Sequence, residues 1–359
     1  MDDTIYLHCL NLFPKFGPKR LAIVANYFES FQQAFSAPVS ELVQAGIASE
    51  VATEFKVFTQ NVVPEAEAEK LLKLNISLLS AQDKLYPTLL KEIELPPQLL
   101  YLRGNLPPAD SIFLAIVGTR KITTYGRSVI PRLAGPLIDA GLVPVSGLAY
   151  GVDAEVARFA VSKHSPTIAV LGSGLDDKTL YPREHALLAE EVVDCGGAIL
   201  SEFAPGTPGF KQNFISRNRI IAGLSIGTLI VECDLKSGSL ITAKYALDMN
   251  RRLYAVPGPI YTTESRGPNN LIKMGATLVT DSSDILQDLN IDPTLESLVL
   301  PDSPQESIIL DILEKGTTSA DELIVQSGLE PSLVTTTLTF LEIKGIIKNV
   351  GAQQYIRVR

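Results

Sequence analysis

Residues 214–258, FISRNRIIAGLSIGTLIVECDLKSGSLITAKYALDMNRRLYAVPG, contain the pattern that decides the fold. Two short apolar runs, GTLIVE and LYAVPG, have the length and the Val, Ile and Leu content of strands that are buried on both faces. Between them, SGSLITAKYAL has helical spacing behind a Ser-Gly-Ser start. A strand, a helix and a second strand in this order indicate a right-handed crossover between parallel strands.

The same pattern recurs through residues 66–290. The apolar runs IFLAIVG, LVPVSG, TIAVLG, AILSE and ATLVT are each followed by a polar loop and an amphipathic segment. Repeated units of this kind predict an α/β fold, with an extended Rossmann-like and mainly parallel sheet. One helical segment contains Pro131 and Pro136, and we expect a kink there because proline removes a backbone donor.

Two smaller domains flank this region. Residues 1–65 show short helical patterns around a Gly-Pro turn, typical of a small sterile-alpha-motif-like or helix-hairpin-helix-like domain. Residues 291–305 carry three prolines and are interpreted as a linker. Residues 306–359 contain patterns for three helices and a two-stranded hairpin, which together predict a winged helix.

Composition bounds the class of protein. At 359 residues, with 46% hydrophobic and 20% charged residues, the chain fits an ordinary soluble protein of several domains. No apolar run reaches the roughly eighteen residues of a membrane span, and the acidic start is unlike a secretory signal. The three cysteines lack metal-ligand spacing. We therefore expect reduced thiols, a cytoplasmic location and no membrane association.

Positive charge is concentrated locally. The net charge of −9 argues mildly against bulk nucleic-acid binding, but phosphate contacts depend on local charge. Residues 209–219 contain Lys211, Arg217 and Arg219 and no acid. Asn218, between the two arginines, adds an amide donor. This cluster suits an anion.

Ligands of open α/β sheets bind beyond the carboxyl ends of the strands, so the loops there are informative. Gly118-Thr119-Arg120 follows a predicted strand, where glycine lets an oxygen approach the backbone and arginine offers a fork of donors. Ser237-Gly238-Ser239 precedes a helix whose free first amides suit a second anion. An ordinary turn remains an alternative for the first of these loops.

Signals of catalysis are missing from the sequence. It contains no G-x-G-x-x-G fingerprint, Walker A loop, nucleophile elbow or Cys/His cluster. We therefore expect no cofactor, no metal and no enzymatic activity. The lone His185 is interpreted as structural and Asp176-Asp177 as a turn.

In this order, the motifs resemble those of the DNA-processing protein A family (DprA/Smf) of bacterial natural transformation. The matching stretches cover roughly residues 80–285 and include AIVGTRKITTYG, SGLAYGVDAEVARFA, TIAVLGSGLDDKTLYP, and RNRIIAGLS followed by SGSLITA. The resemblance implies an extended Rossmann fold that binds single-stranded DNA in a basic pocket. It also implies that the protein forms a homodimer and helps to load the RecA recombinase, and we expect the dimer to form through the Rossmann-like domain.

Carried over onto this chain, the resemblance implies DNA contacts by charged residues of the motifs. Together with the glycine, hydroxyl and amide groups of the same loops, the predicted DNA-binding residues are Gly118, Thr119, Arg120, Arg183, Lys211, Arg217, Asn218, Arg219, Ser237, Gly238, Ser239 and Arg251. The chain departs from the usual family pattern at His185, Ile215, Cys233 and Asn250, where the family has Asn, Pro, Ala and Gly.

The leading hypothesis is a non-enzymatic protein that binds and protects incoming single-stranded DNA and mediates recombination during natural transformation. Single strands are held by backbone charge and by base stacking, for which Tyr150, Tyr181, Phe210 and Phe214 are candidates.

Two other functions compete with it. One is a nucleotide or nucleoside-phosphate hydrolase on a related fold, with Glu202 or Glu232 as base, although the phosphate loop usual in such enzymes is missing. The other is a winged-helix transcription regulator. The segment EPSLVTTTLTFLEIK, which holds the predicted recognition helix 331–344, has one lysine, two acids and no arginine. We therefore predict that the winged helix has little affinity for duplex DNA and serves protein contacts or weak DNA binding.

Overall fold

The computed structural model describes residues 2–108, 110–291, 303–313, 318–343, 346–351 and 354–357. The chain folds as two compact units, Met1–Ile285 and Leu286–Arg359. Most of the predicted linker, residues 292–302, lies outside the described residues. Within the described part of the chain, no helix is long and apolar enough to cross a membrane.

A nine-stranded sheet forms the centre of the first unit. Its strand order is β1-β2-β6-β5-β4-β3-β7-β8-β9, and the neighbours from β6 to β9 are parallel. The hairpin β1–β2 is antiparallel and pairs antiparallel with β6, which confirms the predicted, mainly parallel sheet. The strands are β1 (Ser77–Ser80), β2 (Leu99–Gly104), β3 (Ile112–Val117), β4 (Leu142–Ser146), β5 (Ile168–Leu171), β6 (Ala198–Ser201), β7 (Gly227–Ile230), β8 (Arg252–Ala255) and β9 (Thr277–Leu278).

Both faces of the sheet are buried under helices, which explains why the strands have continuous apolar sequences. In β5, for example, Ala169 and Leu171 contribute to one hydrophobic cluster, whereas Ile168 and Val170 contribute to the other. The first face is covered by α8 (Thr124–Asp139), α9 (Val152–Ser162) and α10 (Ala186–Asp194). The second is covered by α7 (Thr88–Lys91), α11 (Lys211–Leu224), α12 (Ser239–Asp248) and α13 (Arg266–Lys273).

Helix α8 contains the two prolines at which a kink is expected. The helix is continuous from Thr124 to Asp139 and ends at neither Pro131 nor Pro136. Its start is capped by the Thr123 hydroxyl, which accepts a hydrogen bond from Gly126 N at 3.2 Å. The prolines therefore do not divide this helix into two elements.

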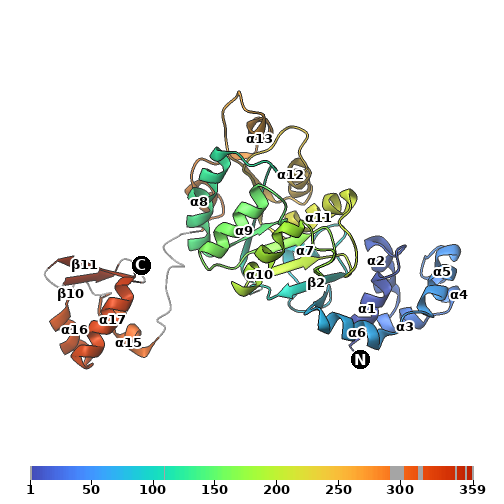
Figure 1. The fold of residues 1–359 in the computed structure, drawn as a ribbon, viewed down its shortest axis with the longest axis horizontal. Helices are drawn as coiled ribbons and strands as arrows, with labels where there is room; N and C mark the ends of the chain where they lie inside the picture. Colours follow the sequence, from blue (N-terminus) through green and yellow to red (C-terminus); the bar gives the residue numbers. More distant parts are fainter. Residues whose placement is uncertain are drawn as a thin grey trace. The chain divides into compact units, whose positions relative to one another are not determined.

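Six short helices precede the sheet. Figure 1 shows α1 and α6 next to the β2 end of the sheet, and buried residues of these helices share a hydrophobic cluster with the sheet. The predicted domain boundary after residue 65 falls inside α6, and it stays a prediction. The helices are α1 (Asp3–Asn11), α2 (Pro18–Tyr27), α3 (Phe31–Ser36), α4 (Val39–Gln44), α5 (Ser49–Thr59) and α6 (Pro64–Lys73).

A buried polar cluster joins α1 to the sheet. Tyr101 of β2 is fully buried, and its hydroxyl lies 2.8 Å from His8 Nδ1 and 3.0 Å from Asn11 Nδ2. Asn11 Nδ2 also donates to the main-chain oxygen of Glu202 at 3.3 Å, just beyond β6. Because a buried phenol needs hydrogen-bond partners, Tyr101 fixes where α1 packs.

The second unit has winged-helix topology, as predicted. Its helices are followed by a hairpin, and the small sheet has the order β10-β12-β11. Ser319 and Glu322 form a capping box at the start of α16. The elements of the winged helix are α15 (Pro304–Leu313), β10 (Thr318–Ser319), α16 (Ala320–Ser327), α17 (Pro331–Ile343), β11 (Ile347–Gly351) and β12 (Gln354–Arg357). Three further short helices lie earlier in the chain: η1 (Arg183–His185), η2 (Thr263–Ser265) and α14 (Ser282–Asp288).

The buried His8 predicts a specific sensitivity to acid. Burial lowers its pKa from 6.5 to about 4, against the opposing attraction of Glu67. Because the unfolded chain then binds the proton more readily, stability is full above about pH 6.5 and falls as the pH drops towards 4, by up to about 3 kcal/mol. Urea unfolding at about pH 7 and about pH 4.5 should show a smaller loss for His8→Gln than for the wild type. Equal losses in both proteins would contradict this assignment.

Candidate functional site

The strand order reverses direction at β3. From β3 the chain moves through β4, β5 and β6 on one side, and then through β7, β8 and β9 on the other. The loops after β3 and β7 therefore lead away from each other, and such a switch point leaves a crevice where open α/β sheets bind ligands. A cavity of about 670 Å³ lies there, lined by the loops after β3, β4 and β7 and by α11 and α12.

Most of the predicted DNA-binding residues line this cavity, which we call the switch-point cavity. They come from three separate parts of the sequence and are brought together only by the sheet topology. They are Gly118, Thr119, Arg120, Lys211, Arg217, Asn218, Ser237, Gly238 and Ser239.

The loop that carries Arg120 interlocks with the loop before α9. Thr119 N donates to Glu232 O at 2.6 Å, and Val152 N donates to Thr119 O at 3.1 Å. Gly151 has φ +78°, and a Cβ there would collide with the carbonyls of Thr119 and Arg120. Only glycine fits this close backbone approach, and the contact fixes the position of Arg120.

Glu232 holds the same segment from the other side. Its side chain is buried, and its carboxylate accepts hydrogen bonds from Thr123 N at 3.0 Å and from the Thr123 hydroxyl at 2.5 Å. The carboxylate therefore stabilises the start of α8. It does not line the switch-point cavity, so it is poorly placed to act as a base there.

Three exposed cations are available in the cavity. Arg120, Lys211 and Lys236 line it, and within the described residues none of them has a hydrogen bond or an ion pair. The guanidinium carbon of Arg120 lies 5.6 Å from the centre of the Phe214 ring, a cation–π contact. Lys236 is not among the residues predicted from the sequence, although its position directly before Ser237 was the available signal.

Arg217 is a structural part of the cavity wall. Its side chain is only 4% exposed, and Nη1 donates to Gly147 O at 2.9 Å and to Val170 O. Burial lowers its pKa to about 10, which still leaves it charged, and the negative charge of Asp153 opposes the shift. Asp153 Oδ2 in turn accepts from Gly147 N at 3.0 Å. Arg217 thus ties β4 and β5 to α11.

The Ser-Gly-Ser segment is also engaged internally. The Ser239 hydroxyl donates to Gly118 O at 2.8 Å, and Ser239 N donates to the Ser237 hydroxyl at 3.3 Å. The next amide, Leu240 N, donates to Ser237 O at 3.2 Å. The expectation of free amides at this helix start is therefore wrong for Ser239 and Leu240. The segment instead joins α12 to the Arg120 loop.

An aromatic pair lies beside the cations. Phe214 packs against Gly172 and Gly209, where an added Cβ would come within 2.7 Å of its ring. The ring of Tyr181 lies 5.3 Å from that of Phe214, and Tyr181 is 40% exposed. Arg183, two residues further on, is exposed without a partner among the described residues, and it lies outside the cavity lining.

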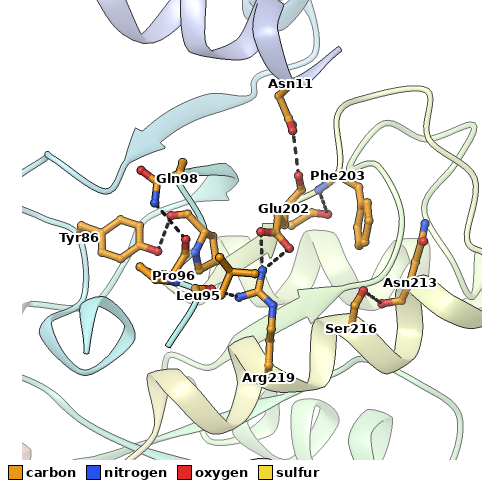
Figure 2. Close-up of polar contacts among 12 residues, drawn as sticks. Asn11, Tyr86, Leu95, Pro96, Gln98, Glu202, Phe203, Asn213, Ser216 and Arg219 are labelled. Carbon is orange, nitrogen blue, oxygen red and sulfur yellow. Dashed lines mark hydrogen bonds and ion pairs between the residues drawn. The ribbon is translucent and has the colours of Figure 1, made fainter. Parts of the chain in front are cut away.

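The remaining two predicted residues occupy a second cavity of about 490 Å³. Arg219 Nη2 contacts both carboxylate oxygens of Glu202 at 2.5 and 2.6 Å, and Nη1 donates to Leu95 O at 2.8 Å (Figure 2). Arg251 donates to Leu89 O at 2.9 Å and to Glu92 at 3.2 Å.

Geometry separates these two arginines from Arg120. Two residues along a helix correspond to a rotation of about 200°, so Arg219 faces away from Arg217. Arg251 lies at the amino end of β8, whereas Arg120 follows the carboxyl end of β3. Arg219 and Arg251 therefore do not share the cavity that Arg120 lines. Their contact with DNA stays a prediction that the geometry does not favour.

The titratable groups offer little for catalysis. His185 is buried, and its Nδ1 lies 2.8 Å from Leu148 O, as expected of a structural histidine. Both candidate bases of a hydrolase, Glu202 and Glu232, are already held by hydrogen bonds. Across the residues that the structure describes, no group of three His, Cys, Asp or Glu side chains has an arrangement that would hold a metal ion.

Comparison with known proteins gives a consistent result. A family model described as DNA recombination-mediator protein A matches residues 77–290, and a model of the DprA winged helix domain matches residues 281–352. Protein Smf of Escherichia coli (strain K12) is 34% identical over 369 residues, covering 100% of this chain and 96% of that protein.

Two solved structures are similar. The X-ray structure of DNA processing protein A from Streptococcus pneumoniae has a TM-score of 0.69 and 30% identity, and the match covers 79% of this chain and 97% of that chain. DNA processing protein A from Helicobacter pylori, whose structure is described as giving insights into its single-stranded DNA binding mode, has a TM-score of 0.53 and 30% identity. That match covers 60% of this chain and 96% of that chain.

The interlocked loops predict a strong effect of a single methyl group. Gly151→Ala should lower the free energy of unfolding by about 2 kcal/mol or more, because the methyl group meets backbone atoms and the φ angle is positive. Gly238→Ala is the matched control, since an added Cβ there meets no atom within 4 Å. Its effect should stay below about 0.5 kcal/mol. Urea denaturation measures both, and equal midpoints would show that the loops do not interlock.

Proposed function

The chain belongs to the DNA recombination-mediator protein A family, and we propose that it binds single-stranded DNA at its switch-point cavity as a recombination mediator. The observation that carries this proposal is the set of exposed, unpaired cations Arg120, Lys211 and Lys236 around one cavity of the described structure. The single-stranded DNA binding described for the similar protein from Helicobacter pylori supports it.

The geometry suits a flexible polyphosphate better than a compact ligand. Single strands bind through backbone charge and through stacking of bases on aromatic rings. The cations would neutralise successive phosphates, while Phe214 and Tyr181 offer exposed ring surface next to Arg120. Because the surrounding loops are held by buried hydrogen bonds, the cations are positioned before DNA arrives, which reduces the ordering cost of binding.

An enzymatic role is not favoured. A hydrolase needs a carboxylate or another base within reach of the bound phosphate ester. The two acids that line the switch-point cavity are Asp153, held by Gly147 N, and Asp234, which accepts from Leu235 N at 2.8 Å. We therefore propose a binding protein that is not an enzyme.

We extend the proposal to the biological role that the family resemblance implies. The protein would act in the cytoplasm, protect incoming single strands and help to load the RecA recombinase during natural transformation. The winged helix would contribute little to duplex binding. The hydroxyls of four threonines on α17 donate to main-chain oxygens of their own helix and are not free for phosphates; these are Thr335, Thr336, Thr337 and Thr339.

Removing single cations should weaken DNA binding in a salt-dependent way. Arg120, Arg183, Lys211 and Lys236 together predict about four phosphate contacts and a log–log salt slope of roughly −3 on single strands. Arg120→Ala or Lys236→Ala should reduce the affinity for labelled oligo-dT several-fold and make the slope shallower by about 0.7. The measurement is a fluorescence titration at several salt concentrations.

The matched control is Lys273→Ala, an exposed lysine on α13 outside the cavity, which should bind like the wild type. Unchanged affinity in both cavity variants would reject the assigned site. The same variants test the mediator role, because a protein that loads RecA through bound DNA should lose its stimulation of RecA strand exchange when Arg120 is removed. Full stimulation by Arg120→Ala would argue against this link.

The edge of the sheet at β9 supports a homodimer. Four large apolar side chains between residues 260 and 278 are strongly exposed, as expected of an interface that a partner covers. They are Ile260, Tyr261, Met274 and Leu278.

Light scattering of the full chain, with and without oligo-dT, should give about twice 38.8 kDa. Ile260→Glu combined with Leu278→Glu should give the monomer mass, because charge at a covered apolar face is costly. Leu85→Glu, on an exposed leucine elsewhere, is the control. A monomeric wild type would contradict the proposal.

A further inference from the structure

A third hollow, a groove with a volume of about 720 Å³, lies at the carboxyl ends of the strands, as the switch-point cavity does. It is formed by α1, α5 and α6 on one side and by the loops after β5 and β6 on the other, all within the first unit. It shares no lining residue with the switch-point cavity. Its apolar walls are Leu12, Phe58, Val62, Leu71, Leu74 and Pro205.

The polar group that lines this groove most deeply is His8, whose side chain is only 2% exposed. The hydrogen bonds of Tyr101 decide which nitrogen of His8 carries the proton. Tyr101 accepts a hydrogen bond from Asn11 Nδ2 and has one proton of its own to give. The buried phenol can donate that proton in a hydrogen bond to His8 Nδ1, 2.8 Å away. In the tautomer that satisfies both groups, Nδ1 accepts and Nε2 carries the hydrogen.

The resulting Nε2–H has no hydrogen-bond acceptor among the described residues. The nearest carboxylate oxygen, Glu67 Oε2, is 3.6 Å away, which is beyond hydrogen-bonding distance. The other carboxylate oxygen of Glu67 is held by Lys70 Nζ at 2.5 Å. A buried donor without an acceptor is costly, so an acceptor supplied from the groove would stabilise this arrangement.

The charges around the groove balance. Three lysines and three acids line it, and several are already paired, as Lys70 is with Glu67. Asp176 accepts from Gly206 N at 2.6 Å and from the Thr179 hydroxyl, so it braces the two loops against each other. A ligand here therefore gains little from carrying a net charge. A groove of this volume is in the range that holds small organic molecules.

We propose that this groove binds an uncharged, mostly apolar small molecule with one hydrogen-bond acceptor, which accepts the proton of His8 Nε2. The apolar body would pack against Leu12, Phe58 and Leu74, and the acceptor would reach the floor of the groove. The site is separate from the proposed DNA site and does not depend on it.

Acetophenone and ethylbenzene make a matched pair of probes, since they have similar shape and only the ketone has an acceptor. The full chain, labelled with ¹⁵N-histidine, contains three histidines, so the His8 resonances are readily assigned. The expected result is a protonated Nε2 on His8 whose signal shifts with acetophenone. Ethylbenzene should bind roughly tenfold more weakly, as the loss of a hydrogen bond to a buried donor predicts.

Val62→Trp should fill the groove and abolish the shift, whereas Val63→Trp should not, because Val63 is 56% exposed and lies outside the lining. Leu74→Trp is a second blocking variant in case Val62→Trp fails to fold. A proton on Nδ1, equal binding of the two probes, or equal behaviour of the blocking and control variants would each overturn the proposal.

Discussion

The position of β3 between β4 and β7 is the constraint on which the functional part of this molecule depends. Parallel neighbours place all their carboxyl ends on one edge, and the reversal of strand order at β3 opens a crevice on that edge. The loops of Gly118 and Ser237 lie about 120 residues apart in sequence, and they meet there through the Ser239–Gly118 hydrogen bond. Without that reversal, helices would cover the space and the cations would not share a cavity.

The predicted DNA-binding cations and Lys236 differ in their burial. Arg217 and Arg219 are buried and bind main-chain oxygens or a carboxylate, so they hold elements together. Arg120 and Lys236 are exposed and have no such partners within the described structure. Desolvating a charge is costly unless it is paired, and a paired arginine has few donors left for a ligand. The exposed class is therefore the one suited to phosphate, even in a protein whose net charge is −9.

The N-terminal helices are attached to the sheet by more than apolar contact. Tyr101 of β2 needs polar partners because it is fully buried, and α1 supplies them with His8 and Asn11. This requirement fixes where α1 packs against β2, and His8 Nε2 is left without a hydrogen-bond partner among the described residues. The hydrogen bond between Tyr101 and His8 Nδ1 thus holds one side of the imidazole ring, while Nε2 on the other side has no partner in the described part of the chain.

The sequence by itself determined the α/β class, the mainly parallel sheet and the winged helix, because buried strands and amphipathic helices impose local periodicities. It also singled out Arg120 through its place in a loop beyond a predicted strand, and Lys211 through the positive segment 209–219, which contains no acid. It did not show that Arg219 and Arg251 lie apart from them, since that follows from helix rotation and from which end of β8 carries Arg251. Lys236 was missed as well, although its position directly before Ser237 is visible in the sequence. Only the tertiary structure decides which side chains share a cavity and which already form hydrogen bonds or ion pairs with buried partners. Both outcomes depend on contacts between distant segments of the chain.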